Sequence, residues 1–220
     1  MTNYTQWKSL VDLHEYSAIP DSELYYRIDE ESGDVFSDSQ GDNDATSTGS
    51  LIWVADSSVG HDWYVELDDT NYLTLNEPFV DWETDWTVGI EIVVDSEIST
   101  DTAFWSWSDG DRIFSIGTDD SGDFGTATWN GSSQVDQPGH SQPEAPYNVD
   151  LVMTWNSSEK DAELFLDESP STLTEQQAAA DDTEGETIGS RTDGTRDIEG
   201  RGVARFSIWD RIVDPSEFTL

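Results

Sequence analysis

YNVDLVMTWNSSEKDAELFLD, residues 147–167, is the stretch that decides the fold class of this 220-residue chain. Apolar and polar residues alternate in its first half, as expected for a β-strand with one buried face. The apolar face carries Val149, Leu151, Met153 and Trp155. Asn156–Lys160 is a polar turn, and residues 162–167 alternate again. The stretch therefore predicts two antiparallel strands that share an apolar face.

Similar runs lie on both sides of it. TVGIEIVV at 87–94 alternates, and AFWSWS at 103–108 is joined to RIFSIGT at 112–118 by Asp109-Gly110-Asp111, a strong hairpin signal. Many short strands without helical crossovers are typical of an antiparallel sandwich. We therefore predict an all-β fold, a two-sheet antiparallel jelly-roll sandwich over residues 21–220, preceded by a short N-terminal arm or helix over residues 1–20.

The arm is predicted from helical spacing of Trp7, Leu10 and Val11 in a segment that ends at Pro20. Two interpretations stay open. The segment is either an interface that packs on a neighbouring subunit or a helix that closes one end of the same domain. The chain has no cysteine and no long apolar run, so the sequence predicts no disulfide, no secretory signal and no membrane span.

Charge dominates the composition. The chain has 9 Lys and Arg against 48 Asp and Glu, a net charge of −39, and its lysines are Lys8 and Lys160 alone. At low ionic strength so many acidic side chains repel one another. In salt of about 1 M the screening length is only about 3 Å, so this repulsion is largely removed. We therefore expect a halophilic protein, the alternatives being an ordinary acidic or a cation-binding protein. Nucleic acid is excluded as a direct partner, because few cations are present to neutralise phosphates.

The scarce basic charge gathers near GVARFSIW, residues 202–209. Five of the nine bases lie in or beside this run: Arg191, Arg196, Arg201, Arg205 and Arg211. Alternation predicts that Ala204, Phe206 and Ile208 face the core, and that Val203, Arg205, Ser207 and Trp209 face away. The arginines are interpreted either as a clasp that neutralises acids around the last strand or as a subunit interface formed by Arg191, Arg196 and Arg201.

The order of the segments resembles the laminin-G-like, concanavalin-A-like jelly-roll superfamily of lectins and glucanases. The matching stretches are residues 24–44, 65–75, 85–97, 147–167 and 187–218. The chain departs from that pattern at Ala204-Arg205, where members often carry acids, at Ser207, where they often carry a base, and at Asp167-Glu168, where an Asp-Gly turn is usual. The resemblance implies a sandwich and two candidate ligand classes, glycans and calcium.

Trp82, Trp105 and Trp107 are the candidate glycan-binding residues, because sugar sites combine aromatic faces with a few polar groups. The alternative is that these rings belong to the core, as we expect for Trp86. Asp109 and Asp111 are the candidate metal ligands, since hard cations take several oxygen ligands from loops. Calcium or a monovalent cation is the candidate ion, and no cofactor is required. The alternative, which we favour, is that these acids belong to the solvated acidic surface.

A hydrolase is not expected. Related glucanases carry Glu-x-Asp-x-x-Glu on one strand, and Glu91 and Asp95 share a face here but have Val93 between them. The sequence therefore predicts a non-enzymatic attachment module. Its most specific form is a homo-oligomeric turret, decoration or fibre protein on the virion surface of a virus infecting an extreme halophile, with other virion subunits and host glycans as partners. The alternatives are a cellular lectin-like adhesion protein of a halophile and, as a weaker alternative, a glycoside hydrolase with an atypical site.

Overall fold

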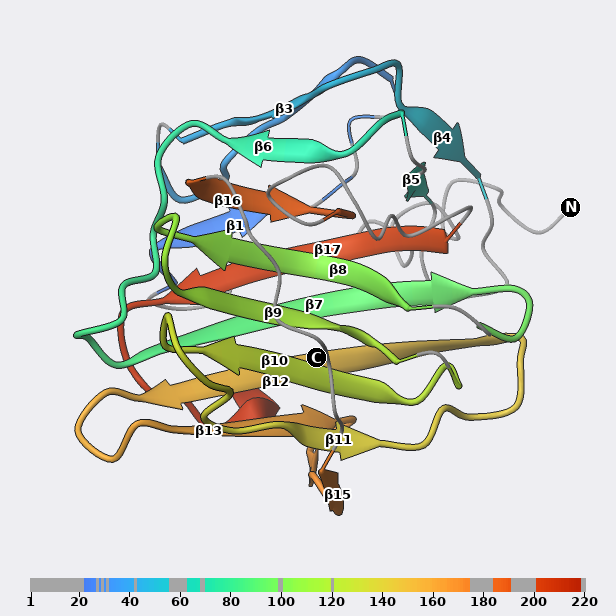
Figure 1. Ribbon diagram of the computed structural model, residues 1–220. Coiled ribbons are helices and arrows are strands. Elements are labelled where there is room, and N and C mark those ends of the chain that lie inside the picture. The colour runs from blue at the N-terminus through green and yellow to red at the C-terminus, as the bar shows by residue number, and fades with distance from the viewer. Residues whose placement is uncertain are drawn as a thin grey trace, which may run out of the picture.

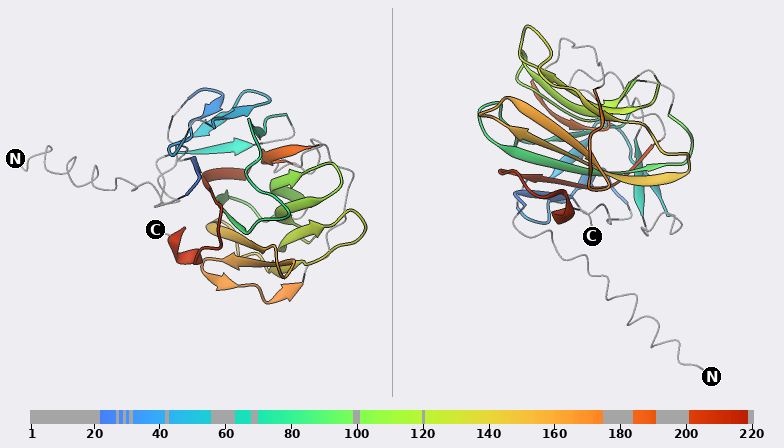
Figure 2. Two further views of the ribbon diagram at one scale, coloured as in Figure 1. Left: turned by 90° about the vertical axis from the view of Figure 1, so that its left-hand side faces the viewer. Right: turned by 90° about the horizontal axis from the view of Figure 1, so that it is seen from below.

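In the computed structural model the chain forms two antiparallel sheets packed face to face (Figures 1 and 2). It describes residues 22–26, 28, 30, 32–41, 43–55, 63–67, 70–98, 101–119, 121–174, 184–190 and 201–218, and for Arg201 the backbone only. The predicted all-β, two-sheet sandwich is confirmed. The predicted arm, including Trp7, Leu10 and Val11, lies outside the described residues, as do Arg191 and Arg196.

The eight-stranded sheet has the order β14-β13-β12-β7-β17-β5-β4, with β1 also paired to β17. Its strands are β1 (Leu24–Tyr26), β4 (Ile52–Val54), β5 (Tyr64–Leu67), β7 (Trp86–Val94), β12 (Tyr147–Asn156), β13 (Asp161–Leu166), β14 (Ser169–Pro170) and β17 (Arg201–Trp209).

The nine-stranded sheet has the order β15-β11-β10-β9-β8-β16-β6-β3-β2. Its strands are β2 (Val35–Phe36), β3 (Ala45–Ser47), β6 (Leu73–Leu75), β8 (Thr102–Ser108), β9 (Ile113–Thr118), β10 (Phe124–Trp129), β11 (Pro138–His140), β15 (Leu173–Thr174) and β16 (Gly185–Ile188).

The apolar faces of β7 and β12 meet the nine-stranded sheet and form the core. The two strands are antiparallel neighbours, with Trp155 opposite Trp86, and both tryptophans are fully buried. β12 and β13 form the predicted hairpin. Aromatic side chains bury about 150–250 Å² each, so a few of them supply a core despite the low apolar content. The prediction that Trp86 belongs to this core is confirmed.

One part of the predicted alternation in β17 is wrong. A β-bulge lies between Val203, which pairs with Ile92, and Arg205, which pairs with Glu91. Because a bulge inserts one extra residue, the faces exchange at this point. Val203 therefore packs in the main core, whereas Ala204 packs in a separate outer cluster. Phe206 and Ile208 face the core as predicted.

After β17 the chain returns across the outer face of the eight-stranded sheet and forms the 3-10 turn η2 (Pro215–Glu217), which is drawn in red in Figure 2. Phe218 follows and packs there with Tyr25, Val152, Trp209 and Val213. A Cβ atom on Gly89 of β7 would lie 2.5 Å from the Phe218 ring, so only glycine allows this approach. The outer face of the sheet is thus covered at its centre.

Candidate functional site

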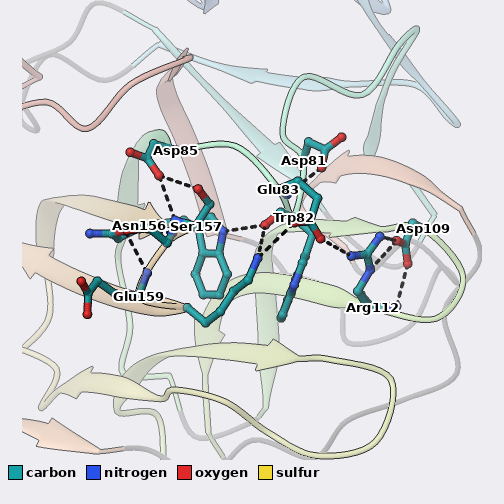
Figure 3. A network of polar contacts seen from close by, with 12 residues as sticks. Asp81, Trp82, Glu83, Asp85, Asp109, Arg112, Asn156, Ser157 and Glu159 are labelled. Carbon is teal, nitrogen blue, oxygen red and sulfur yellow. Dashed lines mark hydrogen bonds and ion pairs between the residues drawn. The ribbon is translucent and has the colours of Figure 1, made fainter.

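Three loops meet at one end of the sandwich, on the left in Figure 1. They are residues 81–85 before β7, residues 109–112 between β8 and β9, and residues 156–160, which include the last residue of β12 and lead to β13. We call this region the Trp82 end (Figure 3). Loops at the ends of rigid sheets are where binding residues are most often found, so this end is the candidate functional site.

The Trp82 ring is enclosed by neighbours. It stacks on Phe114 with ring centroids 5.0 Å apart and lies 4.8 Å from the Trp155 ring. Lys160 Nζ lies 5.4 Å from the ring centroid, and the Arg112 guanidinium carbon lies 5.5 Å from it. Cations over indole faces are stabilised by the ring quadrupole. Trp82 therefore holds two of the chain's few bases and is only 6% exposed.

Lys160 gains more than a cation–π contact. Its backbone has a φ of 54°, a left-handed conformation that is uncommon for lysine. From there its Nζ donates a 3.0 Å hydrogen bond to the backbone oxygen of Trp82 and lies 3.5 Å from a carboxylate oxygen of Glu83. Lys160, one of the two lysines of the chain, therefore connects residues 156–160 to residues 81–85.

Arg112 organises the hairpin turn between β8 and β9. Its Nε donates to Asp109 Oδ2 at 2.7 Å, and its backbone N–H donates to Asp109 Oδ1 at 2.7 Å. Partial burial acts to raise the pKa of Asp109, but hydrogen bonds from Arg112 and Asp111 and the charge of Arg112 outweigh it and lower that pKa. The Asp109 carboxylate is therefore ionised and committed to Arg112.

These contacts bear on the predicted metal site. Asp109 is occupied by Arg112, and its Oδ1 also accepts the N–H of Asp111. Within the described ranges no group of three or more His, Cys, Asp or Glu side chains is placed to hold a metal ion. The pairing of Asp109 and Asp111 as cation ligands therefore has no support in the geometry of this turn.

The predicted glycan-binding tryptophans do not offer ring faces to a ligand. Trp105 has no exposed surface and Trp107 is 5% exposed, and both pack in the main core with Trp82. A sugar stacks on an indole face only where that face is open to solvent. The alternative stated for these residues, that they are core aromatics, agrees with the structure.

Glu186 on β16 is a buried acid that no motif in the sequence marks. Its Oε1 accepts the indole N–H of Trp105 at 2.8 Å, and its Oε2 accepts the backbone N–H of Phe79 at 2.8 Å. Burial raises the pKa of Glu186 to about 7, although these hydrogen bonds and one from the Val80 N–H oppose the rise. Glu186 thus fastens the loop that carries Trp82 to the nine-stranded sheet.

A second group of buried acids lies on the outer face of the eight-stranded sheet. Arg205 Nη2 is 3.0 Å from Asp150 Oδ1 and 3.4 Å from Glu91 Oε2, and Asn148 donates to Glu91 Oε1 at 3.0 Å. Phe218 covers Arg205, with its ring centroid 4.2 Å from the guanidinium carbon. The clasp interpretation holds for Arg205. The interface prediction for Arg191, Arg196 and Arg201 concerns side chains outside the described residues.

The partial glucanase motif has no catalytic geometry. Glu91 is 5% exposed and paired with Arg205, whereas Asp95 lies just beyond the end of β7 and is exposed. A glycosidase needs two carboxyl groups that flank an open site for the sugar.

Among the described residues, no helix is both long enough and apolar enough to cross a membrane.

Comparison of sequences finds no matching family profile and no matching curated protein. Solved structures do match the fold. The receptor binding domain of the botulinum neurotoxin C/D mosaic serotype is 7% identical with a TM-score of 0.67, covering 91% of this chain and 50% of that chain. For the type G receptor binding domain the identity is 10% and the TM-score 0.63, covering 90% of this chain and 49% of that one.

Trypanosoma rangeli sialidase in complex with sialic acid is 13% identical with a TM-score of 0.60, covering 92% of this chain and 33% of that chain. This chain therefore spans from a third to a half of the length of these structures. Similarity at such low identity shows the fold, and it agrees with the jelly-roll sandwich that the sequence predicts.

Proposed function

We propose that this protein is a non-enzymatic attachment module that works at a surface in concentrated salt. Its most specific form is a turret, decoration or fibre protein on a virion that infects an extreme halophile. The observation that carries the proposal is the fold, because about nine-tenths of the chain superposes on two receptor binding domains. The sialidase bound to sialic acid supports a sugar as the ligand class.

The enclosed tryptophans decide how such a ligand would be recognised. With Trp82, Trp105 and Trp107 buried, none of these three indole faces is available for stacking by a sugar. Polar loop groups remain, and at this end Glu83 is 71% exposed in its side chain. We therefore expect a hydrogen-bonding site with shallow contacts, of the kind that gains strength from several copies in one assembly.

Two buried acids are not candidates for catalytic groups. Glu91 is paired with Arg205, and Glu186 is held by N–H donors inside the sandwich. Neither carboxyl group faces a site where a substrate and a water molecule could reach it, as glycoside hydrolysis requires.

Cell binding tests the function directly. The full chain, labelled and kept in multimolar KCl, is expected to bind the surface of halophilic archaeal cells, and periodate oxidation of the cell-surface sugars is expected to abolish binding. Heat-unfolded protein with the same label is the control for non-specific adsorption. Binding that survives periodate would exclude a glycan ligand, and binding to no halophile would contradict the attachment role.

Two further measurements separate the alternatives. Proteomics of purified virions that detects the chain as a stoichiometric component supports the viral role, whereas its presence in the surface fraction of uninfected cells supports a cellular adhesion protein. Release of reducing sugar from polysaccharides would overturn the non-enzymatic proposal.

Unchanged circular dichroism on dialysis from multimolar to millimolar salt would contradict the high-salt adaptation, since a net charge of −39 is then unscreened.

A further inference from the structure

Two turns of the chain share one sequence pattern. TWNGSS, residues 128–133, ends β10, and TWNSSE, residues 154–159, ends β12. Both contain Asn-x-Ser, the acceptor triplet for N-linked glycans. A third triplet, Asn3-Tyr4-Thr5, lies outside the described residues. The two described triplets lie at the same end of the sandwich, because β10 ends beside the start of β9.

The side chain of each asparagine contributes only its carbonyl oxygen to the turn. Asn130 Oδ1 accepts the backbone N–H of Ser132 at 3.0 Å and its hydroxyl at 2.9 Å. Asn156 Oδ1 accepts the corresponding groups of Ser158 at 3.1 and 2.8 Å. Among the described residues, none accepts a hydrogen bond from the Nδ2 of either asparagine. The amide nitrogen is therefore not needed for the turn.

The same turn is made by aspartate elsewhere in the chain. Asp119 Oδ1 accepts the N–H and hydroxyl of Ser121 at 2.8 and 2.7 Å. Asp214 does the same for Ser216 at 3.0 and 2.7 Å. Aspartate and asparagine are equivalent for this purpose, since each offers the accepting oxygen. In a chain with 48 acidic residues, asparagine at 130 and 156 differs from aspartate by its amide nitrogen.

The two asparagine turns differ in how firmly they are held. Residues 130–133 are all exposed, and the Asn130 N–H closes the turn on the Ser133 oxygen at 3.2 Å. Asn156 is half-buried, and the next residue is anchored (Figure 3). Ser157 donates its N–H and its hydroxyl to Asp85 Oδ1, each at 2.8 Å. A transferase can therefore reach Asn130 in the folded protein, whereas the Asn156 turn is fastened to the neighbouring loop.

We propose that Asn130 is an N-glycan acceptor in the folded protein and that the Ser157–Asp85 contact protects Asn156. In the transfer, Nδ2 of Asn130 forms a bond to the anomeric carbon of a glycan carried on a lipid phosphate. The bond from that carbon to the phosphate oxygen breaks, and the phosphate leaves with the electron pair. One proton of the amide passes to a base of the transferase, and no oxidation or reduction occurs.

This modification goes beyond the proposed function, because it concerns a sugar that the protein carries, not one that it binds. The modification also constrains which end of the sandwich can face a neighbouring subunit. A glycan on Asn130 projects from the end where residues 109–112 lie, since a Cβ atom on Gly131 would be 3.4 Å from the Asp111 backbone oxygen. That end must then face solvent in any assembly.

The test uses the purified full chain, folded in multimolar KCl, with solubilised membranes of an N-glycosylating halophilic archaeon as the source of transferase and lipid-linked glycan. A sequon peptide known to be modified by the same membranes is the positive control. Peptide mass spectrometry is expected to find a glycan on the fragment with Asn130 and none on the fragment with Asn156. Ser157→Ala, which keeps the Asn-x-Ser triplet, is expected to add modification at Asn156.

Matched variants separate glycosylation from turn formation. Asn130→Asp keeps the accepting oxygen, so the thermal midpoint is expected to stay unchanged while the glycan is lost. Ser132→Ala removes the glycan, and Ser133→Ala retains it. An unmodified Asn130 beside a modified control peptide would overturn the proposal. So would equal modification of Asn156 in the unaltered chain, or a large fall in the midpoint of Asn130→Asp, which would make the amide a structural group. None of these readouts depends on cell binding.

Discussion

Two regions of the sandwich bury acidic side chains and stabilise them differently. Glu186 faces the core and is held by N–H donors of Trp105 and Phe79. Glu91 and Asp150 lie on the outer face of the eight-stranded sheet and share Arg205 beneath Phe218. The N–H donors carry no positive charge that could balance the Glu186 carboxylate, so burial raises the pKa of Glu186. In the outer group a cation opposes the charge, so stability depends on keeping that cation.

Removing the cation has the largest expected effect. Arg205→Met leaves Glu91 and Asp150 buried without a positive partner, which costs about 3–5 kcal/mol of unfolding free energy. Denaturant unfolding at fixed high salt measures it. Replacing all three residues by neutral, similarly sized side chains is the control, because an entire buried network can be exchanged at little cost. An Arg205→Met protein as stable as the parent would show that this group does not depend on its cation.

Glu186 is expected to make stability depend on pH. Its folded-state pKa, about 7, lies above the unfolded value of 4.5, so its contribution is fully present below pH 4.5 and is lost as the pH rises through 7. The shift corresponds to about 3 kcal/mol. The measured quantity is the stability of the parent minus that of Glu186→Gln, from pH 4.5 to 7.5. A difference that stays constant over this range would contradict the buried, ionisable role.

Thinning the cover over Arg205 gives a smaller effect. Phe218→Leu keeps an apolar side chain but removes the ring face that contacts the guanidinium, and a cation–π contact of this kind is worth about 0.5–2 kcal/mol. We expect a loss in that range by denaturant unfolding. In the Arg205→Met background the same substitution should cost less, and an unchanged cost there would mean that the ring acts by packing alone.

The pairs of Arg112 near the surface give the smallest effect. Arg112→Gln removes contacts to Asp109 and Glu83 that lie near the surface, with the Arg112 side chain 32% exposed. Such pairs are worth about 0–1 kcal/mol and weaken with salt. The destabilisation is therefore expected to shrink between low and high KCl, whereas that of Arg205→Met changes little. Equal salt dependence would remove the distinction between the two kinds of pair.

The fold was readable from the sequence because alternation is a local property. β7, β12 and β13 each bury one face, and their turns have strong signals, so the hairpins and the sandwich follow from neighbouring residues. The exchange of Val203 and Ala204 could not be foreseen, since a bulge depends on pairing with β7 and β5. The tight turn at Asp167-Glu168 keeps positive φ values of 46° and 66° without the glycine that usually accompanies them.

The site was less readable, because burial decides what an aromatic or acidic side chain does. Trp105 and Trp107 have the composition of a sugar site, but the sheet directs them into the core. Glu186 stands in a chain of 48 acidic residues, and nothing local separates it from the exposed ones. The Asn-x-Ser triplets are different. They carry a signal in the sequence itself, and the structure adds which of the two asparagines can be reached.

The central place of β17 has a consequence for synthesis. Of the strands that the structure describes it is the last in chain order, yet it joins β7 on one side to β5 and β1 on the other (Figure 1). Until residues 201–209 leave the ribosome, β7 is without this neighbour, and so are β5 and β1. Their open strand edges are prone to pair with other chains. The domain therefore completes its folding only after translation of this strand, and the emerging chain needs protection until then.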